Sequence, residues 1–554
     1  MGKSPVASGA RRVGSSGWSL VAALIALLVL LPILSVAWIA LNPTENIWPH
    51  LIATTLPRYL ASTAMLAGSV AVVSACVGTG AAWLVVMYSF PLSRMLQWLL
   101  LLPLAIPAYV GAYALVDFLE YAGPVQTALR EAFGWRNSRD YWFPEIRSMW
   151  AAIVVLSAAL TPYVFLLARA GFREQSGNIY EVARALGAGP FARFWRVGLP
   201  MARPAIVAGV AIVMMETVSD FGAVSYFAVQ TLTTGIFSTW LETSNAGGAA
   251  QIAGVVLLIV LLLLGMEKAS RGRARYHGGS RSARPVVPVA LTGWRGWLAT
   301  CLCSIPFLVG FVLPTGVILS HALRHPDYWV DAGLAQAFVN TLTVGGIAAV
   351  LTVLAALIMV YGVRLSGRRL PRLLLPATTL GYAAPGAVLG VGLLIPMAAT
   401  DNAFADAVQA LTGYDPGLLM TGTSFAIIYA YCVRFFAIAQ GAADSAMGRV
   451  APSLGWAARS LGQSAGGTLR RIYMPLIRGS VGTALLLVFV DCVKELPATL
   501  LLRPFNYNTL ATRVYEKASL EQIGQAAPAA MLVIGVGLVA VVLMARSEHA
   551  SDLT

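Results

Sequence analysis

Charged side chains are scarce in this chain. They make up 11% of its 554 residues, whereas hydrophobic residues make up 58% and the mean hydropathy is +0.74. Soluble domains carry about 25% charged residues, so this composition excludes a string of soluble domains. Apolar runs long enough to cross a bilayer recur along the chain, and they predict one bundle of many transmembrane helices.

Cysteine is also rare, and its distribution excludes a disulfide framework. The Cys301-x-Cys303 pair could suggest metal binding, but Cys commonly serves as a small apolar residue inside helices. We therefore predict no certain metal site. The five cysteines are scattered through apolar runs at Cys76, Cys301, Cys303, Cys432 and Cys492.

One motif is missing altogether. No GxxxxGK[ST] phosphate-binding loop occurs in the sequence, so we expect no ATP site in this chain. The sequence predicts a transport subunit that is not an enzyme and has no cofactor of its own.

Hydropathy predicts an all-α polytopic membrane protein with about twelve transmembrane helices. Six spans in each half give the two halves the same orientation, so they form two parallel six-helix repeats. The expected spans are 19–41, 60–88, 96–116, 149–168, 205–226, 248–266, 297–319, 337–361, 374–397, 419–440, 479–500 and 526–545.

The net charge of +14 could indicate a nucleic-acid-binding protein, but the positions of the basic residues exclude one. With both termini in the cytoplasm, most Lys and Arg lie in inside segments, which is the positive-inside bias. The opposite orientation would put the basic segments 268–296 and 362–373 outside. We predict a multi-pass protein of the lipid bilayer with no nucleic-acid partner.

Composition divides the chain into five parts. Cytoplasmic tails are expected at both ends, and a basic cytoplasmic linker is expected between the two halves. The parts are the tail 1–18, the first half 19–267, the linker 268–296, the second half 297–545 and the tail 546–554.

Two polar, arginine-rich stretches interrupt the apolar pattern at matched positions in the two halves. They are Glu181 to Pro200 and Trp456 to Pro475, and in each a Gly precedes the Pro by thirteen positions. Such a repeat indicates an internal duplication. Each stretch predicts a short helix, a break at Gly, a second short helix, and a transmembrane helix that begins at Pro. The element could bind a soluble partner or be an ordinary basic loop.

The first stretch resembles the "EAA" loop of type I binding-protein-dependent ABC importer permeases, and the second departs from it at Trp456 and Met474. In that family the loop forms a coupling helix that fits a groove on the ATPase subunit. The residues that match are Glu181, Ala183, Gly187, Leu199 and Pro200 in the first copy, and Ala457, Ala458, Gly462, Ile472 and Pro475 in the second.

The resemblance implies several partners and a location. Two ATP-binding subunits, as a homodimer that carries ATP and Mg, would bind on the cytoplasmic side. A periplasmic binding protein would deliver the substrate, and the chain would lie in the bacterial inner membrane.

Two acidic pairs fall inside expected spans, where charge is costly and indicates function. Glu216 and Asp220 are four residues apart, as are Asp491 and Glu495, so each pair should line one helical face. We expect the four carboxylates to line a translocation pathway for a hard cation. The alternative is that they only hold helices together through basic partners such as Lys494.

Two prolines are placed in that pathway with the acids. Pro107 and Pro385 lie within the third and ninth expected spans, at nearly the same offset as the two polar stretches. Broken helices often mark a transport pathway, although simple kinks would have the same sequence pattern.

The flanks of the acids are similar to the ferric-iron branch of the permease family. The matching blocks are ETVSDFGAVSYFAVQT from Glu216 and KELPATLLLRP from Lys494. The resemblance implies ATP-driven Fe(III) import. The alternatives are a thiamine or polyamine permease of the same family, or an ion-coupled secondary transporter that uses the acids.

Overall fold

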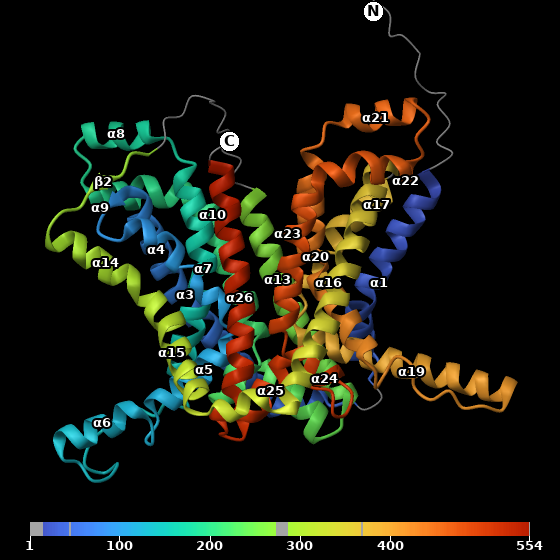
Figure 1. Cartoon of the computed structure of the whole chain (residues 1–554), viewed down its shortest axis with the longest axis horizontal. Helices are drawn as coiled ribbons and strands as arrows, with labels where there is room; N and C mark the ends of the chain where they lie inside the picture. Colours follow the sequence, from blue (N-terminus) through green and yellow to red (C-terminus); the bar gives the residue numbers. More distant parts are fainter. Residues whose placement is uncertain (1–14, 44–45, 273–285, 367–368, 553–554) are drawn as a thin grey trace, which may run out of the picture.

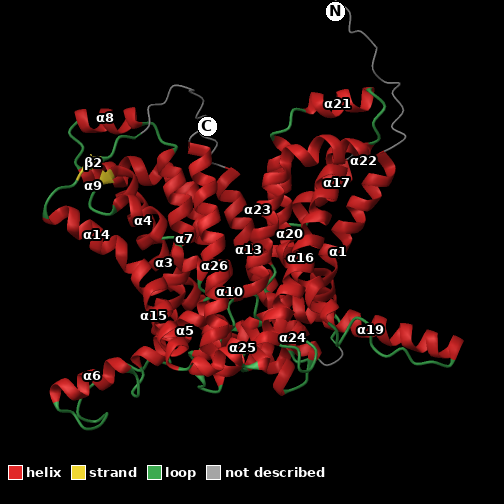
Figure 2. Cartoon of the chain, in the orientation of Figure 1, coloured by secondary structure: helices red, strands yellow, loops and turns green. Residues whose placement is uncertain are grey.

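The computed structural model describes residues 15–43, 46–272, 286–366 and 369–552. Most of these residues are helical (Figure 2), and the chain folds into a bundle of long helices. Eleven helices of the described residues are long and apolar enough to cross a membrane. The pair Ser93–Ala105 and Ala108–Phe133, bent by 93°, brings the number to twelve if it is counted as one broken span. The predicted all-α membrane fold is therefore confirmed.

The elements of the first half run from α1 to α13. They are α1 (Ser15–Leu41), α2 (Trp48–Ala53), α3 (Leu56–Met87), β1 (Tyr88–Ser89), α4 (Ser93–Leu99), η1 (Leu102–Ala105), α5 (Ala108–Leu119), α6 (Pro124–Phe133), α7 (Met149–Arg173), α8 (Gly177–Ala185), α9 (Pro190–Arg193), η2 (Phe194–Gly198), α10 (Leu199–Ser219), α11 (Gly222–Tyr226), α12 (Leu232–Phe237), η3 (Ser238–Glu242) and α13 (Ala246–Gly272).

The elements of the second half run from β2 to α26. Its elements are β2 (Val289–Ala290), α14 (Trp294–Phe307), η4 (Leu308–Val312), α15 (Leu313–Arg324), η5 (Pro326–Val330), α16 (Ala332–Ser366), α17 (Arg369–Ala377), α18 (Leu380–Ala383), α19 (Gly386–Thr412), α20 (Ser424–Gly448), α21 (Pro452–Ser460), α22 (Ala465–Thr468), η6 (Leu469–Tyr473), α23 (Met474–Lys494), α24 (Pro497–Leu502), α25 (Leu510–Ser519) and α26 (Ile523–Asp552).

The duplication is visible in single hydrogen bonds as well as in helix order. Thr63 on α3 accepts the backbone N–H of Leu232 at 3.0 Å, and Thr341 on α16 accepts that of Leu510 at 2.8 Å. Both receiving helices, α12 and α25, begin with a threonine capping box. Capping of this kind satisfies N–H groups that a helix start leaves free. The two halves therefore repeat the same local hydrogen-bonding arrangement.

The outermost helices of each half pack against the core of the other half. Helices α1 and α13 of the first half pack against α16 and α19 of the second, and share a hydrophobic core with them. Helices α14, α15 and α26 of the second half belong instead to the core built around α3, α5 and α7. Each half thus packs against spans that belong to the other half.

One end of the bundle carries both polar loops. Figure 1 shows α8 and α21 at the same end as the start of α1 and the end of α26, with α6, α24 and α25 at the opposite end. Residues 1–14 of the predicted tail and 273–285 of the predicted linker lie outside the described residues. The last part of that linker forms β2, which pairs in parallel with β1.

Two expected spans end earlier than predicted. Spans 205–226 and 479–500 stop as helices at Ser219 and Lys494. The next residues, Asp220 and Glu495, take extended backbone angles because their carboxylates bind the N–H groups of the following short helices. A side chain that caps one helix competes with continuation of the one before it.

These two spans also begin earlier than predicted. Each is one continuous helix, from Pro190 to Ser219 and from Ala465 to Lys494, so Pro200 and Pro475 do not start new helices. A π-helical turn precedes each proline, at η2 and η6. Such a turn accommodates the N–H that proline lacks without ending the helix.

Candidate functional site

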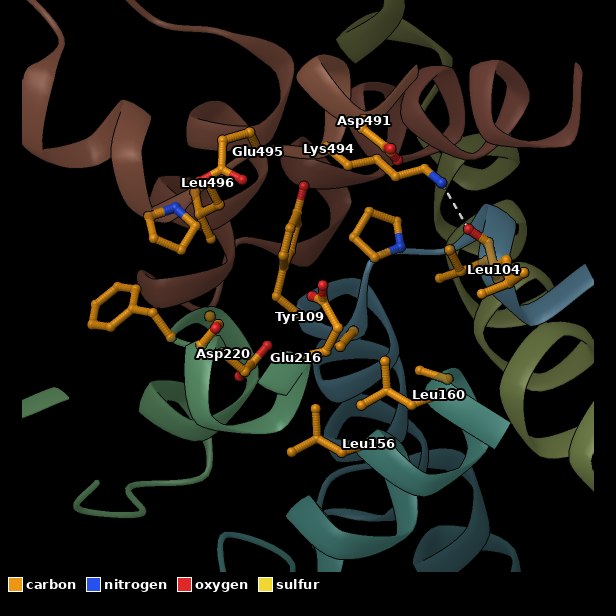
Figure 3. Close-up of a pocket in the computed structure, with 18 of the residues that line it drawn as sticks. Leu104, Tyr109, Leu156, Leu160, Glu216, Asp220, Asp491, Lys494, Glu495 and Leu496 are labelled. Atoms are coloured by element: carbon orange, nitrogen blue, oxygen red, sulfur yellow. Dashed lines mark hydrogen bonds between the residues drawn. The ribbon is translucent and has the colours of Figure 1, made fainter. Parts of the chain in front are cut away.

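A polar cavity lies where the two halves meet. It encloses about 180 Å³ and is lined by the ends of α10 and α23, the break between η1 and α5, and side chains from α7, α18 and α20. All four predicted carboxylates and Pro107 line it (Figure 3). Pro385 is not a lining residue, but its neighbour Gly386 packs directly against the Glu495 carboxylate. The fold thus gathers groups that lie in different halves of the sequence.

The two acids of each pair are held in different ways. Glu216 and Asp491 project from α10 and α23, whereas Asp220 and Glu495 follow the ends of these helices. Asp220 accepts the backbone N–H groups of Ala223 and Val224, both at 3.0 Å. The prediction that each pair lines one helical face is therefore wrong, because the helix stops between its two members. The acids still share a cavity, since the chain turns back into it.

Two basic side chains also reach the cavity. The Arg434 Nε lies 2.9 Å from the Glu495 carboxylate, and both side chains are largely excluded from solvent. Lys494 donates to the carbonyl oxygen of Leu104 at 2.7 Å. Sequence analysis overlooked Arg434, although an arginine within the expected span 419–440 was a detectable signal.

Two hydrogen bonds at the cavity join the halves. The Tyr382 hydroxyl of the second half donates to Glu216 of the first at 3.3 Å, and the Lys494–Leu104 bond crosses the same boundary. Four carboxylates face two cationic groups, so the lining is acidic when all are ionised. Such a surface can attract a cation and hold it through oxygen atoms.

The two predicted coupling loops each present an apolar tip. Leu186 is 82% exposed and Leu461 is 84% exposed, at the ends of α8 and α21. The Gly that follows each has a positive φ, +83° at Gly187 and +86° at Gly462, which favours glycine. The predicted break at Gly is present in both copies.

Each loop is fixed to its transmembrane helix by a tyrosine that lies over a glycine. In the first copy a Cβ at Gly198 in η2 would lie 3.1 Å from the Tyr180 hydroxyl of α8, and Trp83 of α3 is nearer still. In the second copy the residue types are exchanged. A Cβ at Gly455 on α21 would lie 2.9 Å from the hydroxyl of Tyr473 in η6. The same contact is thus made from opposite sides.

The predicted coupling residues divide by burial. Ala458 is buried, Ala183, Leu199 and Ile472 are partly buried, and the rest are exposed: Glu181, Gly187, Pro200, Ala457, Gly462 and Pro475. Six of the ten predicted coupling residues therefore lie on the surface of the described structure.

Residues 74–276 match the family described as "Binding-protein-dependent transport system inner membrane component". The Fe(3+)-transport system permease protein FbpB 2 of Haemophilus influenzae is 26% identical over 498 residues, covering 86% of this chain and 88% of that protein. Residues 74–276 therefore belong to the binding-protein-dependent ABC importer permeases. The similarity to the ferric permease extends over most of the chain, which supports a fused form with two permease halves.

The chain is also similar to a second ferric permease and to a sulfate permease. The ferric transport system permease protein FbpB of Actinobacillus pleuropneumoniae is 24% identical, over 80% of this chain and 64% of that protein. The sulfate transport system permease protein CysT of Escherichia coli is 30% identical over 33% of this chain and 65% of its own length. The ferric relatives match 80% or more of this chain and so reach both halves, whereas the sulfate relative matches 190 residues, less than the length of one half.

The family gives the permease a general setting. It is a multi-pass inner-membrane component that works with a binding protein and an ATPase. The matched region includes the loop at Glu181–Pro200 and the acids Glu216 and Asp220, and it ends before the second half.

Proposed function

We propose that this permease is the membrane subunit of an ABC importer for ferric iron. A periplasmic protein would deliver Fe(III) to the end that carries α24 and α25. Two ATPase subunits would bind at α8 and α21, on the cytoplasmic side with both termini. The observation that carries the proposal is the cavity between the halves, which four carboxylates line.

The sign of charge in this cavity favours a cation over an oxyanion. The relatives include permeases whose names give sulfate and molybdenum as cargo. An acidic lining would repel sulfate or molybdate, whereas carboxylate oxygens suit hard cations. The ferric relatives also cover most of the chain. Charge and similarity therefore support the same cargo class.

Continuous helices provide a route from the loops to the acids. The helix Pro190–Ser219 has 30 residues and spans about 45 Å at 1.5 Å per residue. It begins within the first loop and ends beside Asp220; the helix Ala465–Lys494 relates the second loop to Glu495 in the same way. Movement of the loops by ATPase closure would therefore shift the cavity acids directly. Opening the path would require the two hydrogen bonds that cross the cavity between the halves to break.

The test replaces Glu216 with Gln and Asp491 with Asn together, and measures Fe(III) uptake per assembled complex in proteoliposomes that contain the ATPase and binding protein. The amides keep the shape and can still accept the Tyr382 hydrogen bond. We expect a fall of tenfold or more, equivalent to about 1.4 kcal/mol. Glu131→Gln on the exposed face of α6 is the matched control and should transport normally.

Other outcomes would contradict the proposal. A normal rate per complex with a reduced yield would make the acids structural. Uptake of thiamine or a polyamine without Fe(III) uptake by the unmodified complex would change the cargo. Uptake that follows an ion gradient and needs no ATPase would indicate a secondary transporter.

A further inference from the structure

One buried hydroxyl in the cavity has no partner. Tyr109 is 5% exposed, and its hydroxyl makes no hydrogen bond within the described residues. Its ring lines the cavity and extends toward the segment that carries Asp491, Lys494 and Glu495 (Figure 3). Buried hydroxyls are normally hydrogen-bonded, so an orphan one at a cavity wall calls for an explanation.

The ring of Tyr109 is held firmly in this position. Pro107 ends the preceding segment with extended backbone angles, and α5 starts at Ala108, so Tyr109 lies in the first helical turn. Gly222 packs against it so closely that a Cβ at that glycine would lie 2.7 Å from the Tyr109 Cβ. A side chain at position 222 would therefore clash with Tyr109.

The tyrosine at position 109 is not repeated in the second half. At the offset that relates Pro107 to Pro385, the counterpart of Tyr109 in the second half is Ala387. Duplication alone therefore does not account for the tyrosine. The acids, by contrast, occur in both halves.

We propose that Tyr109 is a ligand for a hard trivalent cation in transit through the cavity, together with carboxylates such as Glu216 and Asp491. This inference rests on the proposed function. Binding replaces the O–H bond of the phenol with an oxygen–metal bond, and the proton leaves the cavity to bulk water. No electron is transferred, so Fe(III) stays ferric.

Charge supports a trivalent cargo. Four ionised carboxylates against Arg434 and Lys494 leave two negative charges in the lining. A phenolate at Tyr109 adds a third, and a trivalent cation would cancel all three. A divalent cation would leave the phenol protonated or the cavity charged.

We place the cation in transit because the cavity lining does not form a complete metal site. Within the described part of the chain, no three His, Cys, Asp or Glu side chains are arranged to hold a metal ion. The Glu495 carboxylate is also engaged by Arg434. Weak, incomplete coordination suits a pathway, since a cargo that binds tightly would not leave.

The test is optical and uses the full-length protein in lipid nanodiscs, titrated with Fe(III) buffered by citrate. A phenolate bound to Fe(III) gives a visible charge-transfer band that carboxylates alone do not give. We expect the band with unmodified protein and its loss in Tyr109→Phe, together with a fall in Fe(III) affinity of about tenfold. Gallium(III), which is trivalent and redox-inactive, should compete for the site.

Tyr113→Phe is the matched control. Tyr113 is one helical turn further along α5, and its hydroxyl is also buried without a partner among the described residues, but it does not line the cavity. This variant should keep the band and the affinity. Thermal unfolding of both variants checks that neither has lost its fold.

The outcomes separate this inference from the proposed function. An unchanged band in Tyr109→Phe, or no band in the unmodified protein while Fe(III) uptake still depends on Glu216 and Asp491, would overturn the tyrosine ligand alone. Absence of Fe(III) uptake by the unmodified complex would overturn the proposed function, whatever the band shows.

Discussion

The Arg434 guanidinium and the Glu495 carboxylate form an ion pair at 2.9 Å, with the two side chains only 12% and 5% exposed. Removing one member of such a pair leaves an uncompensated charge in a poorly solvated place. We expect Arg434→Met to destabilise the permease by about 3–5 kcal/mol, as measured by thermal and denaturant unfolding in detergent.

The double variant Arg434→Met with Glu495→Gln provides the control for this pair. It removes both charges, so most of the lost stability should return. Equal stability of Arg434→Met and the unmodified protein would show that the pair is solvated enough to be dispensable.

The breaks in the two loops depend on backbone conformation. Gly187 has φ +83° and Gly189 has φ −66°, and a Cβ would meet no atom within 4 Å at either one. Gly187→Ala should therefore cost about 1–2 kcal/mol locally, and Gly189→Ala almost nothing. We expect only Gly187→Ala to lower transport per ATP hydrolysed. Equal coupling ratios in the two variants would refute a role for the break.

The contact between Tyr473 and Gly455 can be tested by introducing a steric clash and then removing it with a second substitution. A methyl group at Gly455 would lie 2.9 Å from the Tyr473 hydroxyl, whereas the ring carbons are at 3.5 Å or more. Gly455→Ala should thus push α21 out of position and weaken ATPase binding. Adding Tyr473→Phe removes the clashing oxygen and should restore it.

Gly466 on α22 is the control for the Gly455 experiment, because a Cβ there meets nothing within 4 Å. Gly466→Ala should bind ATPase normally in a pull-down. If Tyr473→Phe fails to rescue Gly455→Ala while Gly466→Ala is normal, the contact does not set the loop position.

Acid sensitivity is expected at the start of α16. The backbone N–H of Gly333 chiefly, and the Arg513 guanidinium, hold the pKa of Asp331 below its usual range. A lowered folded-state pKa gives stability that is present above the unfolded pKa of about 3.9 and is lost as pH falls through the folded value. Asp331 is 42% exposed, so we expect at most about 1 kcal/mol.

Melting temperatures of the unmodified protein and Asp331→Asn would check this effect. The difference should be constant above about pH 5 and shrink toward zero below about pH 4. Asp327→Asn, at a nearby exposed position, should show no such trend. A difference that grows on acidification would have the wrong sign for the proposed cause.

The sequence by itself determined the class of this protein. Long apolar runs predicted the helical membrane bundle, and the matched offsets of loops, prolines and acids predicted two parallel copies. These features are local, because hydrophobic length and a Gly–Pro spacing act within one segment. The left-handed conformation at Gly187 and Gly462 follows from the same local chemistry.

Only the tertiary structure decided how the site is assembled. It ended α10 and α23 one residue before Asp220 and Glu495, exchanged the outer helices between halves, and brought Arg434 and Tyr109 to the acids. Capping competes with helix continuation by small energy differences that hydropathy does not register. Contact between residues in opposite halves of the chain depends on how two whole halves pack, and no single stretch of sequence contains that information.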